Sequence, residues 1–535
     1  MSHMKTLIIY TLVITLITYY YSTIVKVTQK SIVNYYYPLD TQHQDIIWAE
    51  TTKKTKKKHP NIILIITDDL GVNDLHESPN INSIYQNGVK FNKAYATQAT
   101  CAPSRASIYS GRFPTKLGLE FTPHPFSLDL MMHMQSGQIR DTILNYSNAL
   151  NIPSMEYLHL NNSETLISNI LHEHKYSNYF IGKWHLGETN GFRPRERGYD
   201  ESLSFLQGAS MYKDKDDDDI VGVEIENSVY DAYMNNLLPF AISHNNKKYF
   251  KPREYMTDYL SNNAIDVIKH SNDTSPFFIT LAYNAPHSPF QALREDYNVQ
   301  TGTRRERVYK AMIRAVDRGV GNIIETLKKE GKYDDTLIIF TSDNGGASLI
   351  GKGDINYPFS GWKCTFFEGG IRVPMFWQWP NKIPKGILYD KTVSHVDIFS
   401  TIQSIVDHDE PNRDGVDLIP YILNEVKYEP HEMLFWRSAD YRLLKLNEWK
   451  LSILDTTNKA WFFNIADDIQ EKNNLLSLIN FNQTIKNKYE EMLKLINKIN
   501  GEQKSPLWNS PIMTAIPIYG PNLTSLDDEF VYWAI

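Results

Sequence analysis

Two pairs of oxygen-bearing side chains each follow a short apolar run of the sequence. Asp68 and Asp69 come directly after the run NIILIIT, and Asp343 and Asn344 come directly after TLIIFTS. Three carboxylates and an amide oxygen are hard ligands suited to a divalent cation, and carboxylate-rich sites favour Ca²⁺ over Mg²⁺. Zinc would be expected to recruit histidine or cysteine. The pattern therefore predicts a calcium site, the alternative being that both pairs only cap helices or turns.

A cysteine lies at the start of a predicted helix. Cys101 opens the segment CAPSRASIYSGR, in which Pro103 suits a first helical turn. Free backbone N–H groups at a helix N-terminus favour an anion, so Cys101 would stand where negative charge is stabilised. Taken alone, a cysteine in this position is as well explained by a structural role. Its chemistry depends on what surrounds it.

Basic side chains and histidines supply the other candidates. Lys183 and His185 follow the apolar run YFIG, and His287 follows PFFITLAY. Arg105 and Lys363 add fixed positive charge, and histidines exchange protons near neutral pH. A lone lysine is usually solvated and a lone histidine is often structural. Their places at strand ends beside the carboxylates make these residues candidates for anion chemistry.

Four apolar runs are expected to be the strands that position these side chains. They are short, continuous and rich in isoleucine and phenylalanine, as strands buried on both faces are. They cover residues 61–67, 179–182, 276–283 and 336–342. In open α/β sheets ligands bind outside the carboxyl ends of the strands, so four such ends predict one shared site.

Helical periodicity separates the strands. Residues 304–330 carry apolar side chains at helical spacing, and Gly331 supplies a stop. The alternation of strands and helices favours a layered α/β domain. The run KDKDDDD at 213–219 lacks the glycine and the spaced glutamate of an EF-hand loop, and it is interpreted as an exposed loop.

The chain is expected to divide into four parts. They are a signal peptide or signal anchor (1–26), a lysine-rich linker (27–60), a large α/β domain (61–425) and a smaller α+β subdomain (426–535).

The N-terminus indicates entry into the secretory pathway. Residues 7–25 carry no charge over 19 residues and precede Lys26, as in a secretory signal peptide or an uncleaved signal anchor. A buried core helix is the other interpretation. We expect a lysosomal or secreted protein, or one anchored in an endomembrane through this segment alone. Glycosylation sequons agree with a lumenal chain; they begin at Asn145, Asn161, Asn272, Asn482 and Asn522.

Composition excludes several classes of protein. The net charge of −7 over 535 residues argues against nucleic acid as the main partner. With hydrophobic residues at 42%, the chain can bury a sizeable core. Only Cys101 and Cys364 are present, so no disulfide framework holds the fold together.

The sequence resembles the type I sulfatase family from about residue 61 to about residue 475. The core motif of that family, Cys-x-Pro-Ser-Arg followed by Gly-Arg, is present at 101–105 and 111–112. Four further motifs are present, and all five stand in the family's order along the chain. DDLG at 68–71 precedes the core motif, and GKWHLG at 182–187, SDNGG at 342–346 and Lys363 ahead of EGGIR come after it. Within the family, GETNGFRPRERG and WKCTFFEGG look most like the arylsulfatase B branch. Residues 120–155 are an addition to that pattern, and we expect them to help shape the substrate pocket.

The resemblance implies the fold and the reaction. The fold would be alkaline-phosphatase-like, an α/β arrangement with a large mixed sheet flanked by helices and a smaller C-terminal α+β subdomain. The reaction would be hydrolysis of sulfate esters, of aryl sulfates in vitro and of sulfated sugars or glycosaminoglycan in vivo. The formylglycine-generating enzyme would convert Cys101 to formylglycine during maturation. No nucleic acid partner is expected.

The resemblance also implies roles for the candidate residues. Cleaving an anionic sulfate ester requires a metal, cations and a proton donor. Residue 101 would join Asp68, Asp69, Asp343 and Asn344 as a metal ligand. Arg105 would hold the hydrated aldehyde, Lys183, His287 and Lys363 would bind sulfate, and His185 would assist breakdown of the sulfated intermediate. Cys364 is expected to be a passive buried thiol.

Two alternatives remain open at this stage. A phosphatase or phosphodiesterase of the alkaline phosphatase superfamily would use a serine or threonine nucleophile and a zinc pair, which Cys101 and the lack of a histidine-rich metal set oppose. A non-catalytic glycan-binding relative would have lost one of Cys101, Asp68, Lys183 or Asp343, and all four are present.

Overall fold

The structure is a computed structural model that describes residues 39–40, 45–48, 59–134, 141–225, 228–272, 274–521 and 529–535. The predicted signal segment 7–25, most of the linker and Asn522 lie outside these residues. Among the described residues, no helix combines the length and the apolar character needed to cross a membrane.

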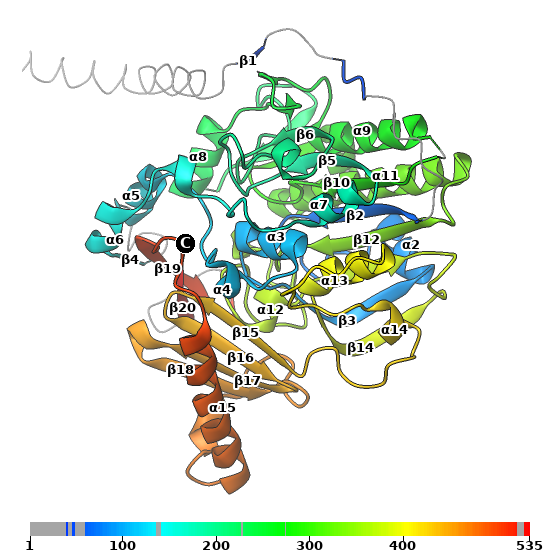
Figure 1. Cartoon of the computed structure of the whole chain (residues 1–535). Coiled ribbons are helices and arrows are strands. Elements are labelled where there is room, and N and C mark those ends of the chain that lie inside the picture. The colour runs from blue at the N-terminus through cyan, green and yellow to red at the C-terminus, as the bar shows by residue number, and fades with distance from the viewer. Residues whose placement is uncertain are drawn as a thin grey trace, which may run out of the picture.

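A nine-stranded mixed sheet forms the centre of the molecule (Figure 1). Its strand order is β14-β3-β13-β12-β2-β10-β5-β6-β8. The strands are β2 (Asn61–Thr67), β3 (Val89–Tyr95), β5 (Ser177–Lys183), β6 (Glu201–Phe205), β8 (Ser243–His244), β10 (Phe277–Ala282), β12 (Thr336–Ser342), β13 (Met375–Gln378) and β14 (Ile387–Ser394). The α/β class and the large mixed sheet expected from the sequence are confirmed.

The four predicted strands are neighbours in the middle of this sheet. They are β2, β5, β10 and β12, they are parallel to one another, and every residue in them is buried. The register places Ser342 opposite Thr67, and Ala282 opposite both Ile66 and Gly182. The carboxyl ends of all four strands therefore lie together at one edge of the sheet.

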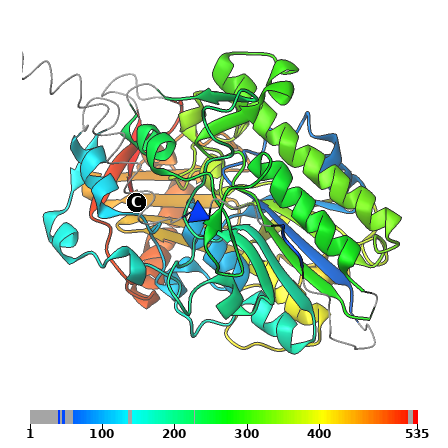
Figure 2. The ribbon, with the colours of Figure 1, turned by 90° about the horizontal axis from the view of Figure 1, so that it is seen from above.

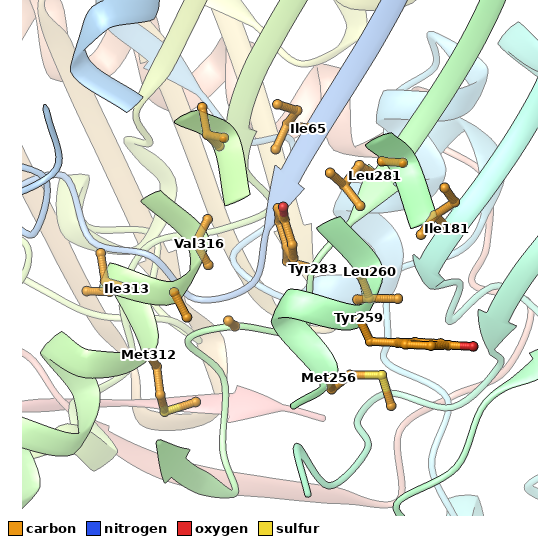
Figure 3. Packing of buried hydrophobic residues seen from close by; sticks show 14 of the residues in the cluster. Ile65, Ile181, Met256, Tyr259, Leu260, Leu281, Tyr283, Met312, Ile313 and Val316 are labelled. Atoms are coloured by element: carbon orange, nitrogen blue, oxygen red, sulfur yellow. The ribbon is translucent and has the colours of Figure 1, made fainter. Parts of the chain in front are cut away.

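Helices cover both faces of the sheet because its strands are apolar on both faces. On one face Ile63 and Ile65 of β2 pack with α9 (Met256–His270) and α11 (Arg304–Lys329). Figure 2 shows these two helices lying along the sheet, and Figure 3 shows side chains of both packing near Ile65. The opposite face packs with α3 (Cys101–Ser110), α7 (Ile167–Glu173) and α13 (Val396–Ile405).

The observed α11 agrees with the helix predicted over 304–330. Thr303 and Glu306 form a reciprocal capping box at its start. Gly331 follows its end with φ +66°, a left-handed conformation that glycine adopts without steric cost.

Other helices and small sheets complete the described chain. The helices are α2 (Pro79–Gln86), α4 (Pro114–Leu117), α5 (Phe126–Met134), α6 (Tyr146–Asn151), α8 (Val229–Leu237), α10 (Arg294–Asn298), α12 (Glu368–Ile371), α14 (Ile419–Ile422) and α15 (Gln483–Glu502). Strand β1 (Leu39–Asp40) pairs with β9 (Tyr249–Phe250), and β7 (Ile220–Val223) pairs with β11 (Phe290–Leu293). Short 3₁₀ helices occupy Met155–Tyr157, Pro194–Arg197, Ser348–Ile350, Asp455–Thr457 and Leu475–Leu478. The run at 213–219 forms a largely exposed turn, as expected.

A second, antiparallel sheet follows the main domain, as the sequence predicts for an α+β part. It contains β15 (Met433–Ser438), β16 (Tyr441–Leu446), β17 (Trp449–Leu454) and β18 (Lys459–Asn464) in chain order. Helix α15 packs on it through Met492 and Ile496. In Figure 1 this sheet and α15 lie below the central sheet.

The segment at 120–155 is joined to the C-terminal end of the chain. It contributes β4 (Thr142–Leu144), which pairs with β19 (Ile512–Pro517), and β19 in turn pairs with β20 (Phe530–Ala534). These last strands thus hold the added segment beside the carboxyl edge of the central sheet.

Candidate active site

The side chains selected from the sequence meet at the carboxyl ends of the central strands. Asp68 and Asp69 follow β2, Asp343 and Asn344 follow β12, and Lys183 ends β5. His185 lies just beyond β5 and His287 just beyond β10, while Cys101 begins α3 and Lys363 lies on a loop before α12. The sheet order brings these segments together because β12, β2, β10 and β5 are neighbours.

Asp68 is fully buried among cations. Its carboxylate accepts a hydrogen bond from Lys183 Nζ, lies 3.6 Å from Arg105 Nη2, and accepts a 3.4 Å hydrogen bond from Cys101 Sγ. Burial acts to raise the pKa of Asp68, but Lys183, His287 and Arg105 outweigh it and hold the pKa below its usual range. The carboxylate is therefore ionised.

Asp69, a candidate metal ligand, contacts both Asn344 and the loop that carries Lys363. Lys363 Nζ lies 2.8 Å from Asp69 Oδ1, and Asn344 Nδ2 donates to the same oxygen at 2.7 Å. His287 Nε2 lies 3.7 Å from Asp69 Oδ2. The backbone N–H of Asp69 donates to Asp343 Oδ1 at 3.3 Å. One carboxylate thus contacts residues from three separate parts of the chain.

Asp343 and Arg105 form a fully buried ion pair. Arg105 Nε donates to Asp343 Oδ2 at 2.8 Å, and its Nη1 donates to the carbonyl oxygen of Lys183 at 3.1 Å. Burial, and then the neighbouring Asp68 carboxylate, raise the pKa of Asp343 to about 6. The arginine fixes the position of α3 relative to strands β5 and β12.

A cluster of buried donor atoms at this site is suited to a metal ion. Asp68, Asp69, Cys101 and His287 each bring one potential ligand atom within 4.8 Å of the others. Asn344 Oδ1 is buried and has no hydrogen-bond partner among the described residues, which is unfavourable unless another group binds it. Asp343 lies beside this group, with its carboxylate turned to Arg105. The carboxylates of Asp68 and Asp69 thus lie close enough to bind one cation, and the side chain of Asn344 lies beside Asp69.

Cys101 lies at the base of the site, at the N-terminus of α3. Lys363 Nζ is 3.1 Å from its sulfur atom. Burial, followed by the Asp68 carboxylate, raises the pKa of the thiol to about 12. An unmodified Cys101 is therefore protonated at neutral pH and is a poor nucleophile.

The two cysteines are not bonded to each other. The expectation that Cys364 is buried is wrong: its side chain is partly exposed and lines the cavity described below. The physical reason is that Cys364 lies on the loop before α12 and lines the cavity, so its side chain is not enclosed by the core.

Both candidate histidines are held in the neutral form. Burial, and then Lys183 and Arg105, lower the pKa of His185 well below its usual value. Burial and Lys363 lower the pKa of His287 to about 4. His185 Nε2 donates to the carbonyl oxygen of Pro123 at 3.4 Å, and its Nδ1 has no hydrogen-bond partner among the described residues. Each ring is thus neutral near neutral pH.

A cavity of about 300 Å³ opens over this group. The candidates that line it are Asp69, Cys101, His185, His287 and Lys363. The others, Asp68, Arg105, Lys183, Asp343 and Asn344, are fully buried and do not line it. The structure therefore separates residues that can touch a ligand directly from residues that support them.

Sequence reasoning missed most of the outer wall of the cavity. The added segment contributes Leu128 and Met132 of α5, in agreement with the expectation that it helps shape the pocket. Helix α8 contributes Met234 and Leu237, which no motif had indicated. Ordinary amphipathic spacing was the one available signal, and it does not distinguish a pocket wall from a core.

Comparisons with known proteins agree with this geometry. A family model described as Sulfatase matches residues 60–408. The chain is 28% identical over 486 residues to the uncharacterized sulfatase YdeN of Escherichia coli K12, covering 82% of this chain and 78% of that one. It is 29% identical over 420 residues to the mouse N-acetylgalactosamine-6-sulfatase, covering 75% and 73%. The crystal structure of Ps i-CgsB in complex with k-i-k-neocarrahexaose matches with a TM-score of 0.68 and 30% identity, over 84% of this chain and 95% of that chain.

Proposed function

Because the chain belongs to the sulfatase family and is a sulfuric ester hydrolase, we propose that it uses a formylglycine derived from Cys101 and a bound calcium ion. The observation that carries this proposal is the position of Cys101. Its sulfur lies at the base of the cavity, 3.1 Å from Lys363 Nζ and 3.4 Å from Asp68 Oδ1. A nucleophile formed at this position would contact a bound sulfate ester beside the ammonium group of Lys363 and the carboxylates of Asp68 and Asp69.

The metal part of the proposal rests on buried oxygens. Asp68, Asp69 and Asn344 would hold the cation, with Asp343 and residue 101 completing the set. Oxygen donors of this kind favour Ca²⁺, with Mg²⁺ second. A cation bound here would polarise the sulfate oxygens as a Lewis acid.

The chain's own residues bind the anion and move protons. Lys363 faces the cavity and stabilises negative charge on sulfate oxygens, with His287 as a neighbouring contact. Lys183 and Arg105 lie behind Asp68, where they keep its carboxylate ionised and oriented. Neutral His185 accepts a proton at Nδ1, which has no competing partner among the described residues. Formylglycine at position 101 would supply a hydrated aldehyde with two hydroxyl groups on one carbon as the nucleophile.

Two classes of alcohol enter the proposal. Sulfated sugars are supported by the similarity to an N-acetylgalactosamine-6-sulfatase and to a protein solved with neocarrahexaose. Aryl alcohols are the second class. The sulfate end of the site serves both, so the groups around the alcohol must distinguish them. Maturation would require the formylglycine-generating enzyme, and we propose a lysosomal, secreted or membrane-anchored location in the secretory pathway.

The test is a comparison of two esters of the same alcohol. Matured enzyme with Ca²⁺ is expected to release inorganic sulfate from 4-nitrophenyl sulfate much faster than phosphate from 4-nitrophenyl phosphate. Cleavage of the phosphate ester alone would favour the phosphatase alternative. Binding of sulfated sugars without release of sulfate, in protein whose formylglycine is verified by mass spectrometry, would favour the non-catalytic one.

A further inference from the structure

Outside the sulfate-binding end, the cavity is lined mainly by apolar side chains. One wall is formed by α5 and α8, which pack against each other. Leu128 and Met132 of α5, four residues apart, line the cavity together, and so do Met234 and Leu237 of α8, three residues apart. Other apolar groups come from separate segments; they are Pro123, Pro125, Met155, Leu158, Leu206 and Ile516.

Charged groups are scarce in this part of the cavity. Among its described lining residues there is no arginine and a single lysine, Lys363, which belongs to the sulfate end. His124 is engaged at both nitrogens, by Thr122 O at 2.7 Å and by Asp129 Oδ1 at 2.5 Å. Glu188 accepts a hydrogen bond from Gln207 and would repel a second anionic group. Among the described lining residues, a glycan with several sulfates would find no lysine or arginine beyond Lys363, which holds the scissile sulfate.

The volume of the cavity limits the size of the alcohol that a bound sulfate ester can carry. Its volume is about 300 Å³. An apolar cavity of about 150 Å³ accepts one benzene ring, so the whole cavity, its sulfate end included, has about the volume of two such ring sites. An extended sulfated oligosaccharide would have to leave most of its hydroxyl groups against carbon, without hydrogen-bond partners.

We infer that the preferred substrate is a monosulfate ester of an apolar, ring-containing alcohol, and that Met132 of α5 and Leu237 of α8 determine this preference. The inference rests on the proposed function, because it assumes that the sulfate lies between Lys363 and residue 101. It selects the aryl class over the sugar class. In this inference, the added segment at 120–155 forms part of an apolar wall around the leaving group.

The first experiment compares two monosulfates on matured enzyme with Ca²⁺. 2-Naphthyl sulfate is expected to have a KM at least about tenfold lower than N-acetylgalactosamine 6-sulfate, because burying a second ring adds apolar contact in the bound ester. Equal values, or preference for the sugar, would overturn the inference while leaving the enzyme a sulfatase.

Two variants assign the preference to the wall. Met132→Gln and Leu237→Asn keep side-chain size and add an amide, and each should lower kcat/KM for 2-naphthyl sulfate by roughly 5- to 30-fold. Each should change the value for the sugar sulfate by less than about twofold. Leu130→Gln is the matched control, because Leu130 lies on the same helix, is 41% exposed and does not line the cavity. Equal losses on both substrates, or an equal loss in the control, would contradict the assignment.

A binding measurement keeps the inference separate from the proposed chemistry. Cys101→Ala should bind 2-naphthyl sulfate more tightly than the sugar sulfate by calorimetry, whether or not the parent protein cleaves either ester. If the parent protein cleaves neither ester but this order of affinity holds, the proposed reaction is refuted, whereas the preference of the cavity for an apolar alcohol is supported. The reverse order of affinity would refute the apolar site.

Discussion

The ammonium group of Lys363 lies 3.1 Å from the sulfur of Cys101, although 262 positions separate the two residues in the chain. The same ammonium group lies 2.8 Å from Asp69. It therefore stands between the metal-type carboxylates and the residue proposed to become the nucleophile. Positive charge at this point stabilises a transition state in which negative charge grows on sulfate oxygens.

Replacing Lys363 tests this arrangement. Lys363→Met removes the charge and keeps most of the side-chain volume, so kcat/KM for 2-naphthyl sulfate should fall by roughly 10²- to 10³-fold. Lys329→Met, on an exposed side chain at the end of α11, is the control and should leave the rate unchanged. Near-parental activity of Lys363→Met would show that the lysine does not stabilise the reaction.

Metal binding provides the second prediction. A chelator should abolish activity, and Ca²⁺ or Mg²⁺ should restore it. Asn344→Leu removes the amide oxygen at nearly constant volume and should weaken Ca²⁺ binding by at least about tenfold, as measured by calorimetry and by metal analysis. Stoichiometric zinc in active protein, without calcium or magnesium, would contradict the oxygen-ligand assignment.

The central strands were predictable because a strand buried on both faces has a continuous run of apolar residues in the sequence. The runs at 61–67 and 336–342 coincide with β2 and β12, since every residue in them packs into the core. Strand β5 is longer than the run predicted over 179–182, because polar Asn178 also belongs to it. Its side chain donates to the carbonyl oxygens of Ser168 and Gly198, which a propensity argument cannot anticipate.

The outer parts of the site could not be predicted in the same way. The three-residue strand β4 exists because it pairs with β19 about 370 positions later, and so short a segment has no periodicity of its own. Sequence order placed Lys183 at a strand end but could not show that its side chain turns back to Asp68. Likewise, nothing in the spacing of Met132 or Leu237 indicated a cavity.

A buried ion cluster that joins the second sheet to helix α12 supplies the third prediction. Lys450 of β17 lies 3.0 Å from Glu368 and 2.6 Å from Glu471, and all three side chains are almost completely buried. Lys450→Met should lower the free energy of unfolding by roughly 3–5 kcal/mol, because it leaves the buried Glu471 without its cation, whereas Glu368 keeps its ion pair with Arg372. Lys450→Met combined with Glu471→Gln should be less destabilised than the single variant in urea denaturation. Additive losses would mean that the pair does not interact.

His395 determines how stability responds to acid in the fourth prediction. It is buried between Ser104 of α3 and Thr341 of β12, each with a hydroxyl 3.1 Å from a ring nitrogen. Burial lowers the pKa of His395 from 6.5 to about 3. Between these values the unfolded chain binds a proton that the folded chain does not, so stability falls as the pH falls, by at most about 1.4 kcal/mol per pH unit.

His395→Gln removes this titration. Its unfolding free energy should be lower at pH 7, by roughly 1–3 kcal/mol for the altered hydrogen bonds. It should depend less on pH than that of the parent between pH 6.5 and pH 4. Parallel curves for parent and variant across this range would show that His395 does not contribute to the acid sensitivity.

The last prediction asks why the chain carries a cysteine at position 101, where the thiol itself is a poor nucleophile. Burial and Asp68 raise the pKa of the thiol to about 12, so its value would lie in conversion to an aldehyde whose hydrate has two hydroxyl groups. Cys101→Ser offers one hydroxyl group in the same place, beside Lys363. It should accept one sulfuryl group from the ester and then stop, because no second hydroxyl is present on that carbon to expel sulfate.

Mass spectrometry of the peptide that contains residue 101 provides the measurement. Cys101→Ser incubated with 2-naphthyl sulfate should gain the mass of one sulfuryl group on this peptide and release about one equivalent of naphthol in a single burst. Cys101→Ala should gain nothing and release nothing, although it still binds the ester. If Cys101→Ser instead turned over repeatedly at a rate near that of the parent, a second hydroxyl group could not be needed for sulfate release. The assignment of formylglycine to position 101 would then be wrong.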